Sequence, residues 1–115
     1  RRAFYECKAR YLGRWLARHN RFAPDIVVWG AGRDTRKRAD LLLDYGIRIT
    51  HYIDIDPRKI GQCIHGRPVW GDADVPDPGH CFVVSYVGSR GARDDIRRRL
   101  SARGYVEGRD FILAA

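Results

Sequence analysis

At 115 residues, with 44% hydrophobic and 31% charged residues, the chain has the composition of one soluble globular domain and is too short for two. No apolar run approaches the roughly 20 residues that a membrane span needs, and the basic N-terminus lacks the apolar core of a secretory signal peptide. The net charge of +8 suggests nucleic acid, but residues 1–22 hold seven Lys or Arg against one Glu, whereas residues 23–115 are nearly balanced.

The leading segment predicts a basic amphipathic helix over residues 4–19, inside a connecting unit of residues 1–22. Phe4, Tyr11 and Trp15 fall on one stripe of this helix, and basic residues occupy the rest of its surface. Such a helix could lie on an anionic membrane or on nucleic acid. Because an aromatic stripe is usually a packing face, we expect instead that it packs against this domain or a neighbouring one.

Strands and helices alternate over residues 23–115, the second unit. We expect strands at residues 25–30, 47–54, 67–71, 81–87 and 110–115, and helices at residues 33–45 and 91–103. Gly46 and Gly104 end the two helices. This alternation predicts an α/β domain of three layers, with a mainly parallel sheet of about five strands in the order 3-2-1-4-5.

Ligands of such sheets bind beyond the carboxyl ends of the strands, where the strand order reverses. In the predicted order this crevice lies between the strands that end at Gly30 and Val87. Each of these two strands runs into a loop that contains glycine and opens a helix.

The first of these loops reads GAGRDT and partly fits the glycine pattern of dinucleotide-binding loops. It comprises Gly30, Ala31, Gly32, Arg33, Asp34 and Thr35. Backbone N–H groups at a helix start attract anions, and Arg33 and Arg36 would add charge-assisted contacts. Thr35 replaces the third glycine, and its branched side chain strains the fit of helix to strand. The loop is therefore either a phosphate site or a plain turn.

The second loop supplies Gly88, Ser89 and Arg90 at the start of the last helix, and Ser89 is a candidate helix cap. Two anion-binding loops at one crevice favour a ligand site over a pair of unrelated turns.

The stretch YIDIDP places Asp54 about twenty residues after the glycine loop, where dinucleotide-binding folds have an acid for the ribose hydroxyls. Asp54 and Asp56 also form an Asp-x-Asp pair of the kind that binds a metal with a sugar nucleotide. A third alternative is that Asp56 caps the turn at Pro57. We expect no metal site, because the Cys and His spacings do not match zinc patterns.

The runs IDIDPRKIG, HGRPVWG and FVVSYVGSRGARDD resemble the Rossmann-like domain found at the C-terminus of some bacterial family 2 glycosyltransferases. They are similar also to the nucleotide-sugar-binding N-terminal domain of bacterial sugar acyltransferases. The resemblance covers about residues 25–115. It implies that Asp54, Gly88 and Ser89 help to hold a uridine nucleotide-sugar. The first loop departs from the Gly-Ala-Gly-Gly-His-Gly of the acyltransferases, and their hexapeptide-repeat domain is absent.

The resemblance implies an accessory domain of a bacterial glycosyltransferase that binds a nucleotide or nucleotide-sugar, such as a UDP-sugar, and does not catalyse a reaction by itself. The alternative is a structural or interaction module without a ligand. The expected partners are a glycosyltransferase catalytic domain in the same longer chain, the nucleotide ligand and, as an option, a second copy of the chain. DNA and a transmembrane segment are not expected. Three cysteines at unrelated spacings favour reduced thiols and a cytoplasmic location.

Overall fold

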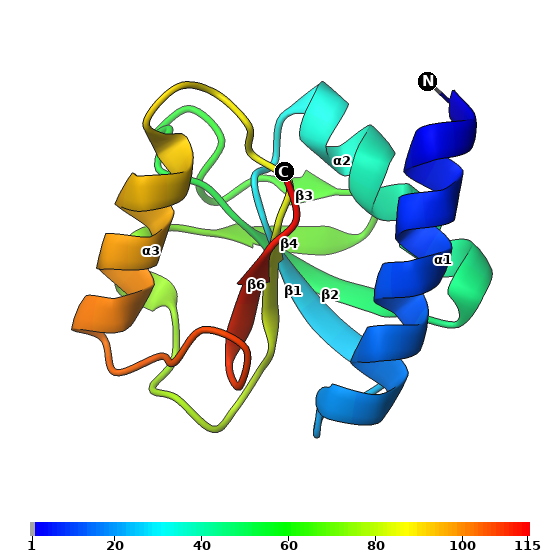
Figure 1. Cartoon of the computed structure of the whole chain (residues 1–115). Helices are drawn as coiled ribbons and strands as arrows, with labels where there is room; N and C mark the ends of the chain where they lie inside the picture. The colour runs from blue at the N-terminus through cyan, green and yellow to red at the C-terminus, as the bar shows by residue number, and fades with distance from the viewer. Residues whose placement is uncertain (1) are drawn as a thin grey trace.

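A computed structural model describes residues 2–115, and within them one mixed sheet lies between two layers of helices (Figure 1). In chain order the elements are α1 (Arg2–His19), β1 (Asp25–Trp29), α2 (Arg33–Asp40), the 3₁₀ helix η1 (Leu41–Tyr45), β2 (Arg48–Ile53), β3 (Cys63–Ile64), β4 (Arg67–Trp70), the 3₁₀ helix η2 (Asp72–Asp74), β5 (Val83–Ser85), α3 (Ala92–Ala102) and β6 (Phe111–Leu113).

The strands lie in the order β3-β4-β2-β1-β5-β6, and every neighbouring pair except β3 and β4 is parallel. Without β3 this is the predicted order 3-2-1-4-5, so the Rossmann-like α/β fold is confirmed. In Figure 1, α1 and α2 cover one face of the sheet and α3 covers the other. Alternate residues of β1 belong to the two hydrophobic cores, one on each face of the sheet. Ile26 and Val28 face the α1 side, and Val27 and Trp29 face the α3 side.

Strand β3 was not expected from the sequence. It forms a hairpin with β4 around His65 and Gly66, whose φ angles are +52° and +77°. Positive φ at both central residues is the geometry of the two-residue turns that suit the twist of antiparallel strands. The hairpin adds a short antiparallel edge strand beside β4.

The first helix is longer than predicted, and its buried face differs from the predicted one. Ala9, Leu12, Gly13 and Leu16 are buried, whereas Phe4 and Tyr11 are 63% and 75% exposed. Phe4 and Tyr11 therefore do not pack against this domain, and the alternative, that they pack against a neighbouring domain, stays a prediction. Trp15 is half-buried, and its ring centroid lies 5.9 Å from that of Phe82.

Gly13 helps to explain this choice of face. A Cβ atom on Gly13 would lie 2.8 Å from Cβ of Tyr45, so η1 approaches the helix backbone more closely than a larger residue allows. The aromatic stripe cannot provide such an approach. The predicted helix over residues 33–45 is confirmed as a helical segment, but it narrows to η1 before Gly46 ends it with a φ angle of +81°. No helix within residues 2–115 is both long and apolar enough to cross a membrane.

Candidate functional site

The two predicted loops emerge from adjacent parallel strands. Trp29 of β1 pairs with Ser85 of β5, and the Ser85 hydroxyl donates to the Trp29 carbonyl oxygen at 3.1 Å. Ser85 is buried, and its hydroxyl oxygen also accepts the Val87 N–H at 3.2 Å. Sequence reasoning missed Ser85, which ties the end of β1 to the start of the second loop. The carboxyl ends of both strands therefore lie at the point where the strand order reverses.

Gly30 makes this close arrangement possible. Its φ angle is +119°, a conformation that favours glycine. A Cβ atom at Gly30 would lie 2.5 Å from Cγ2 of Thr35 and 2.7 Å from Cγ2 of Val87. The bulk of Thr35, which the sequence marks as a strain on the helix packing, is thus accommodated by the space that Gly30 leaves. The same contact brings the second loop against the first.

Gly32, by contrast, faces open space. A Cβ atom there would have one neighbour within 4 Å, the Nζ atom of Lys59 at 3.8 Å. Gly32 is the N-cap of α2, and no side chain caps this helix. Within residues 2–115, no acceptor is found for the backbone N–H groups of Arg33, Asp34 and Thr35. The start of α2 therefore presents free N–H donors to solvent.

Asp54 reaches this loop from the end of β2. Its Oδ2 atom accepts the Ala31 N–H at 2.9 Å, and its Oδ1 atom accepts the Asp56 N–H at 2.9 Å. The carboxylate thus joins the glycine loop to the turn that follows β2. Each oxygen keeps a second lone pair, so the carboxylate can still accept a hydrogen bond from a hydroxyl group.

The turn after β2 brings a cation that sequence reasoning missed. Asp56 accepts the Arg58 N–H at 2.9 Å and forms a 3.1 Å ion pair with its guanidinium; the expected role of Asp56 in capping this turn is confirmed. The Arg58 guanidinium holds the pKa of Asp56 below its ordinary value. Lys59 instead lies beside Gly32 and forms no salt bridge within residues 2–115. The run DPRKIG predicts the turn, but it does not predict that Arg58 pairs with Asp56 while Lys59 lies beside Gly32.

The charged residues of the first loop divide into two groups. Arg33 and Asp34 are exposed at the start of α2. Arg36 is half-buried and donates from Nε to the Ala31 carbonyl oxygen at 2.9 Å, so it holds the loop in place. Of these arginines, Arg33 is the one left with its charge at the loop surface.

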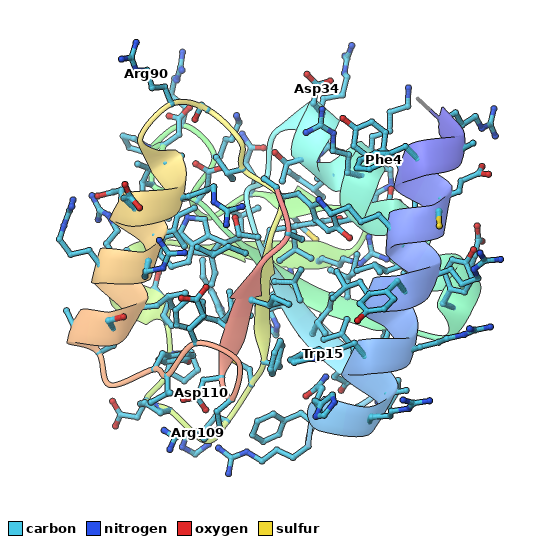
Figure 2. All side chains as sticks on the ribbon, viewed as in Figure 1. Phe4, Trp15, Asp34, Arg90, Arg109 and Asp110 are labelled. Carbon is cyan, nitrogen blue, oxygen red and sulfur yellow. The ribbon has the colours of Figure 1, made fainter. Side chains whose placement is uncertain are left out.

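The second loop is more open than the first. Gly88, Ser89 and Arg90 are all exposed, and Figure 2 shows Arg90 at the same end of the molecule as Asp34, pointing outward. Ser89 does not cap α3, so this prediction is wrong: the N-cap is Gly91, with a φ angle of +79° and no side-chain hydrogen bond. A Cβ atom on Gly88 would lie 3.4 Å from Cβ of Ala115. The residues at the end of the chain thus lie against this loop.

The described residues contain no group of three or more Cys, His, Asp or Glu side chains placed to hold a metal ion. A groove of about 710 Å³ lies beside the glycine loop, between α1 and α2. Asp34 is the one predicted site residue that lines it; the others are Arg2, Tyr5, Lys37, Arg38 and Leu41.

Comparison with known proteins gives one structural likeness. No family model matches the chain, and no curated protein matches it. It is similar to a chain in a solved structure described as the crystal structure of RSP in complex with beta-NADH, at 17% sequence identity and a TM-score of 0.47. The match covers 77% of this chain and 51% of that one, so this chain spans about half the length of its structural neighbour.

Proposed function

We propose that this domain binds the phosphate groups of a nucleotide at the carboxyl edge of β1 and β5. The observation that carries the proposal is the open space at Gly32, which lies at the uncapped start of α2 and beside the Lys59 ammonium. Helix N–H groups and an adjacent cation are the partners that a phosphate group requires.

In this proposal each element of the site has its own task. The N–H groups of residues 33–35 donate to phosphate oxygens, and Lys59 and Arg33 supply compensating charge. Gly30 and Asp54 shape the loop through their contacts with Thr35 and Ala31. The free lone pairs of the Asp54 carboxylate accept a hydrogen bond from a ribose hydroxyl.

A nucleotide-sugar is the more specific ligand that we propose, for an accessory domain of a bacterial glycosyltransferase. The residue pattern from Asp54 to Ser89 supports this choice. In this proposal the domain positions the sugar donor, and the reaction takes place on a catalytic domain elsewhere in a longer chain.

A structural module without a ligand is the second candidate. It is favoured by the two backbone hydrogen bonds that Asp54 accepts and by the contact between Gly88 and Ala115. In that case the two loops only join strands to helices, and the free N–H groups are hydrated.

Calorimetry with UDP, UDP-glucose, NAD and coenzyme A distinguishes the two candidates. Binding tighter than about 1 mM, equivalent to roughly 4 kcal/mol, supports the nucleotide site. Gly32→Val should abolish this binding and leave the melting temperature nearly unchanged, because the added side chain enters open space. Titrations in which all four compounds bind more weakly than that limit favour the structural module.

Lys59→Ala and Arg58→Ala form a matched pair for the same titration. Both remove one positive charge from the same turn, but the Arg58 side chain pairs with Asp56 and is 89% exposed. Loss of Lys59 should weaken nucleotide binding about tenfold or more, which is the effect of one charge-assisted hydrogen bond. Arg58→Ala should leave the affinity within about twofold. Equal effects of the two changes would mean that general charge, not the site, attracts the ligand.

A further inference from the structure

The solvent side of α1 carries exposed aromatic residues on a strongly basic helix. Phe4 and Tyr11 are 63% and 75% exposed. With the exposed Cys7 they follow i, i+3, i+7 spacing and therefore form one line along the helix. This line lies opposite the buried residues of α1. The line and its flanking cations together are here called the α1 outer face; the cations are Lys8, Arg10, Arg14 and Arg18.

The charge of this face is not compensated within the domain. Glu6 is the one acidic residue of α1, and it pairs with Arg2 at 3.2 Å. None of the four flanking cations forms a salt bridge within residues 2–115. The groove between α1 and α2 extends the positive surface through Lys37 and Arg38. An anionic partner would therefore find unpaired positive charge on this face.

We propose that the α1 outer face docks on an anionic lipid bilayer. Phenyl and phenol rings insert at the boundary between headgroups and acyl chains, while arginine and lysine stems extend to the anionic headgroups. The buried face of the helix stays attached to the sheet through Leu12 and Leu16. The whole domain is then held at the membrane surface by one helix.

The shape of the surface favours a bilayer over a nucleic acid. In Figure 1, α1 forms one outer side of the molecule, with α2 on one flank and the η1 segment on the other. Phe4 and Tyr11 are the exposed rings on this helix. Single strands bind in basic grooves where bases stack on aromatic rings, and a duplex has no free base faces for such rings. A flat bilayer accepts a convex helix along its length.

A fluorophore sensitive to polarity tests the orientation on the membrane. The probe is attached to Cys7 in a background of Cys63→Ser and Cys81→Ser, or to Cys63 in a background of Cys7→Ser and Cys81→Ser. Cys7 and Cys63 are free and exposed, and Cys81 is free and half-buried. Vesicles of phosphatidylglycerol and phosphatidylcholine should shift the emission of the Cys7 probe to the blue and leave the Cys63 probe, on β3, unchanged. Vesicles of phosphatidylcholine alone should shift neither.

Charge variants provide the matched control. Arg14→Gln with Arg18→Gln should weaken binding to anionic vesicles about thirtyfold, since each basic residue near such a surface contributes about fivefold. Arg58→Gln with Arg98→Gln removes two exposed charges away from α1 and should change binding about twofold at most. Phe4→Ser with Tyr11→Ser should weaken binding about tenfold. All three double variants should keep the melting temperature of the parent.

Three results would overturn the proposal. One is a failure of the 115-residue chain to sediment with anionic vesicles at low salt. Another is equal probe shifts at Cys7 and Cys63. The third is tight binding of a labelled single-stranded oligonucleotide that depends on Phe4 and Tyr11, with no binding to vesicles. The proposal is independent of nucleotide binding, because none of the outer-face residues belongs to the glycine loop. Gly32→Val, which should abolish nucleotide binding, should therefore leave vesicle binding unchanged.

Discussion

The Oδ2 atom of Asp54 accepts the backbone N–H of Ala31 at 2.9 Å, across the space between the ends of β2 and β1. The same side chain accepts the N–H of Asp56 through its other oxygen. One carboxylate therefore holds the glycine loop and also the turn that places Lys59 beside Gly32. The shape of the candidate site depends on this side chain before any ligand arrives.

Asp54→Ala should consequently lower stability as well as affinity. We expect a loss of about 2 kcal/mol in the free energy of unfolding, because two hydrogen bonds to a charged acceptor disappear and the Ala31 N–H loses its partner. Urea denaturation measures this loss. If Asp54 serves only a ribose, the variant should unfold at the same urea concentration as the parent.

Ligand titration separates the two roles of Asp54. Asp54→Asn keeps one carbonyl oxygen and removes the charge, so a pure ribose contact predicts weaker binding of UDP and unchanged binding of inorganic pyrophosphate. A loop-shaping role predicts that both ligands weaken, because the N–H groups that bind phosphate move. Calorimetry at equal ionic strength measures the loss of affinity for each ligand, and comparison of the two losses distinguishes the roles.

Gly30→Ala should be among the most destabilising single substitutions in the chain. The positive φ angle and the contacts with Thr35 and Val87 together should cost about 3 kcal/mol. Gly108→Ala is the matched control, since Gly108 has a φ angle of +90° and no neighbour within 4 Å of the added atom; it should cost about 1 kcal/mol. Thr35→Ser removes the nearer methyl group and should partly rescue Gly30→Ala. Equal losses for both glycines would contradict the close contact.

Asp110 should make stability depend on pH in the acidic range. Burial by itself raises the pKa of this carboxyl, but hydrogen bonds from Arg109 and the Val106 N–H, with the charges of Arg109 and Arg21, outweigh burial and leave the pKa below its ordinary value. A depressed pKa stabilises the fold above the unfolded-state value of about 4, and this contribution is lost as pH falls through the folded-state value.

Asp110→Asn tests this dependence. At about pH 7 the variant should be less stable by about 2 kcal/mol, because a buried acceptor of the Val106 N–H and an arginine is altered. The difference from the parent should shrink when urea denaturation is repeated at about pH 3. A difference that stays constant with pH would show that packing, not charge, is responsible.

The two sides of α1 should respond differently to truncation. Leu16 is fully buried, so Leu16→Ala should cost about 3 kcal/mol of unfolding free energy. Phe4→Ala should change stability by about 0.5 kcal/mol or less, since the ring is mostly exposed. Thermal melts of the two variants measure both values. A large loss with Phe4→Ala would place its ring in a contact that the monomer lacks, such as an interface between two copies.

Local signals in the sequence were enough to predict the five parallel strands of the sheet and their order. Short apolar runs, each followed by a glycine or an acid and then a helical segment, define a parallel sheet, because parallel strands need crossovers. Gly46, which ends the η1 segment, and the glycine loop after β1 were also predictable from the sequence. Gly46 and Gly30 have positive φ angles, a conformation that favours glycine and so depends on one residue.

The tertiary structure decided which groups meet. The sequence of α1 contains both an aromatic stripe and a stripe of alanine, glycine and leucine, and the second is buried, with Tyr45 close to Gly13. The hydrogen bond from Ala31 to Asp54 and the place of Lys59 beside Gly32 join residues that lie more than twenty positions apart. Periodicity fixes which residues share a face of one element, but partners across elements depend on how the ends of several strands converge, and that convergence exists only in the folded chain.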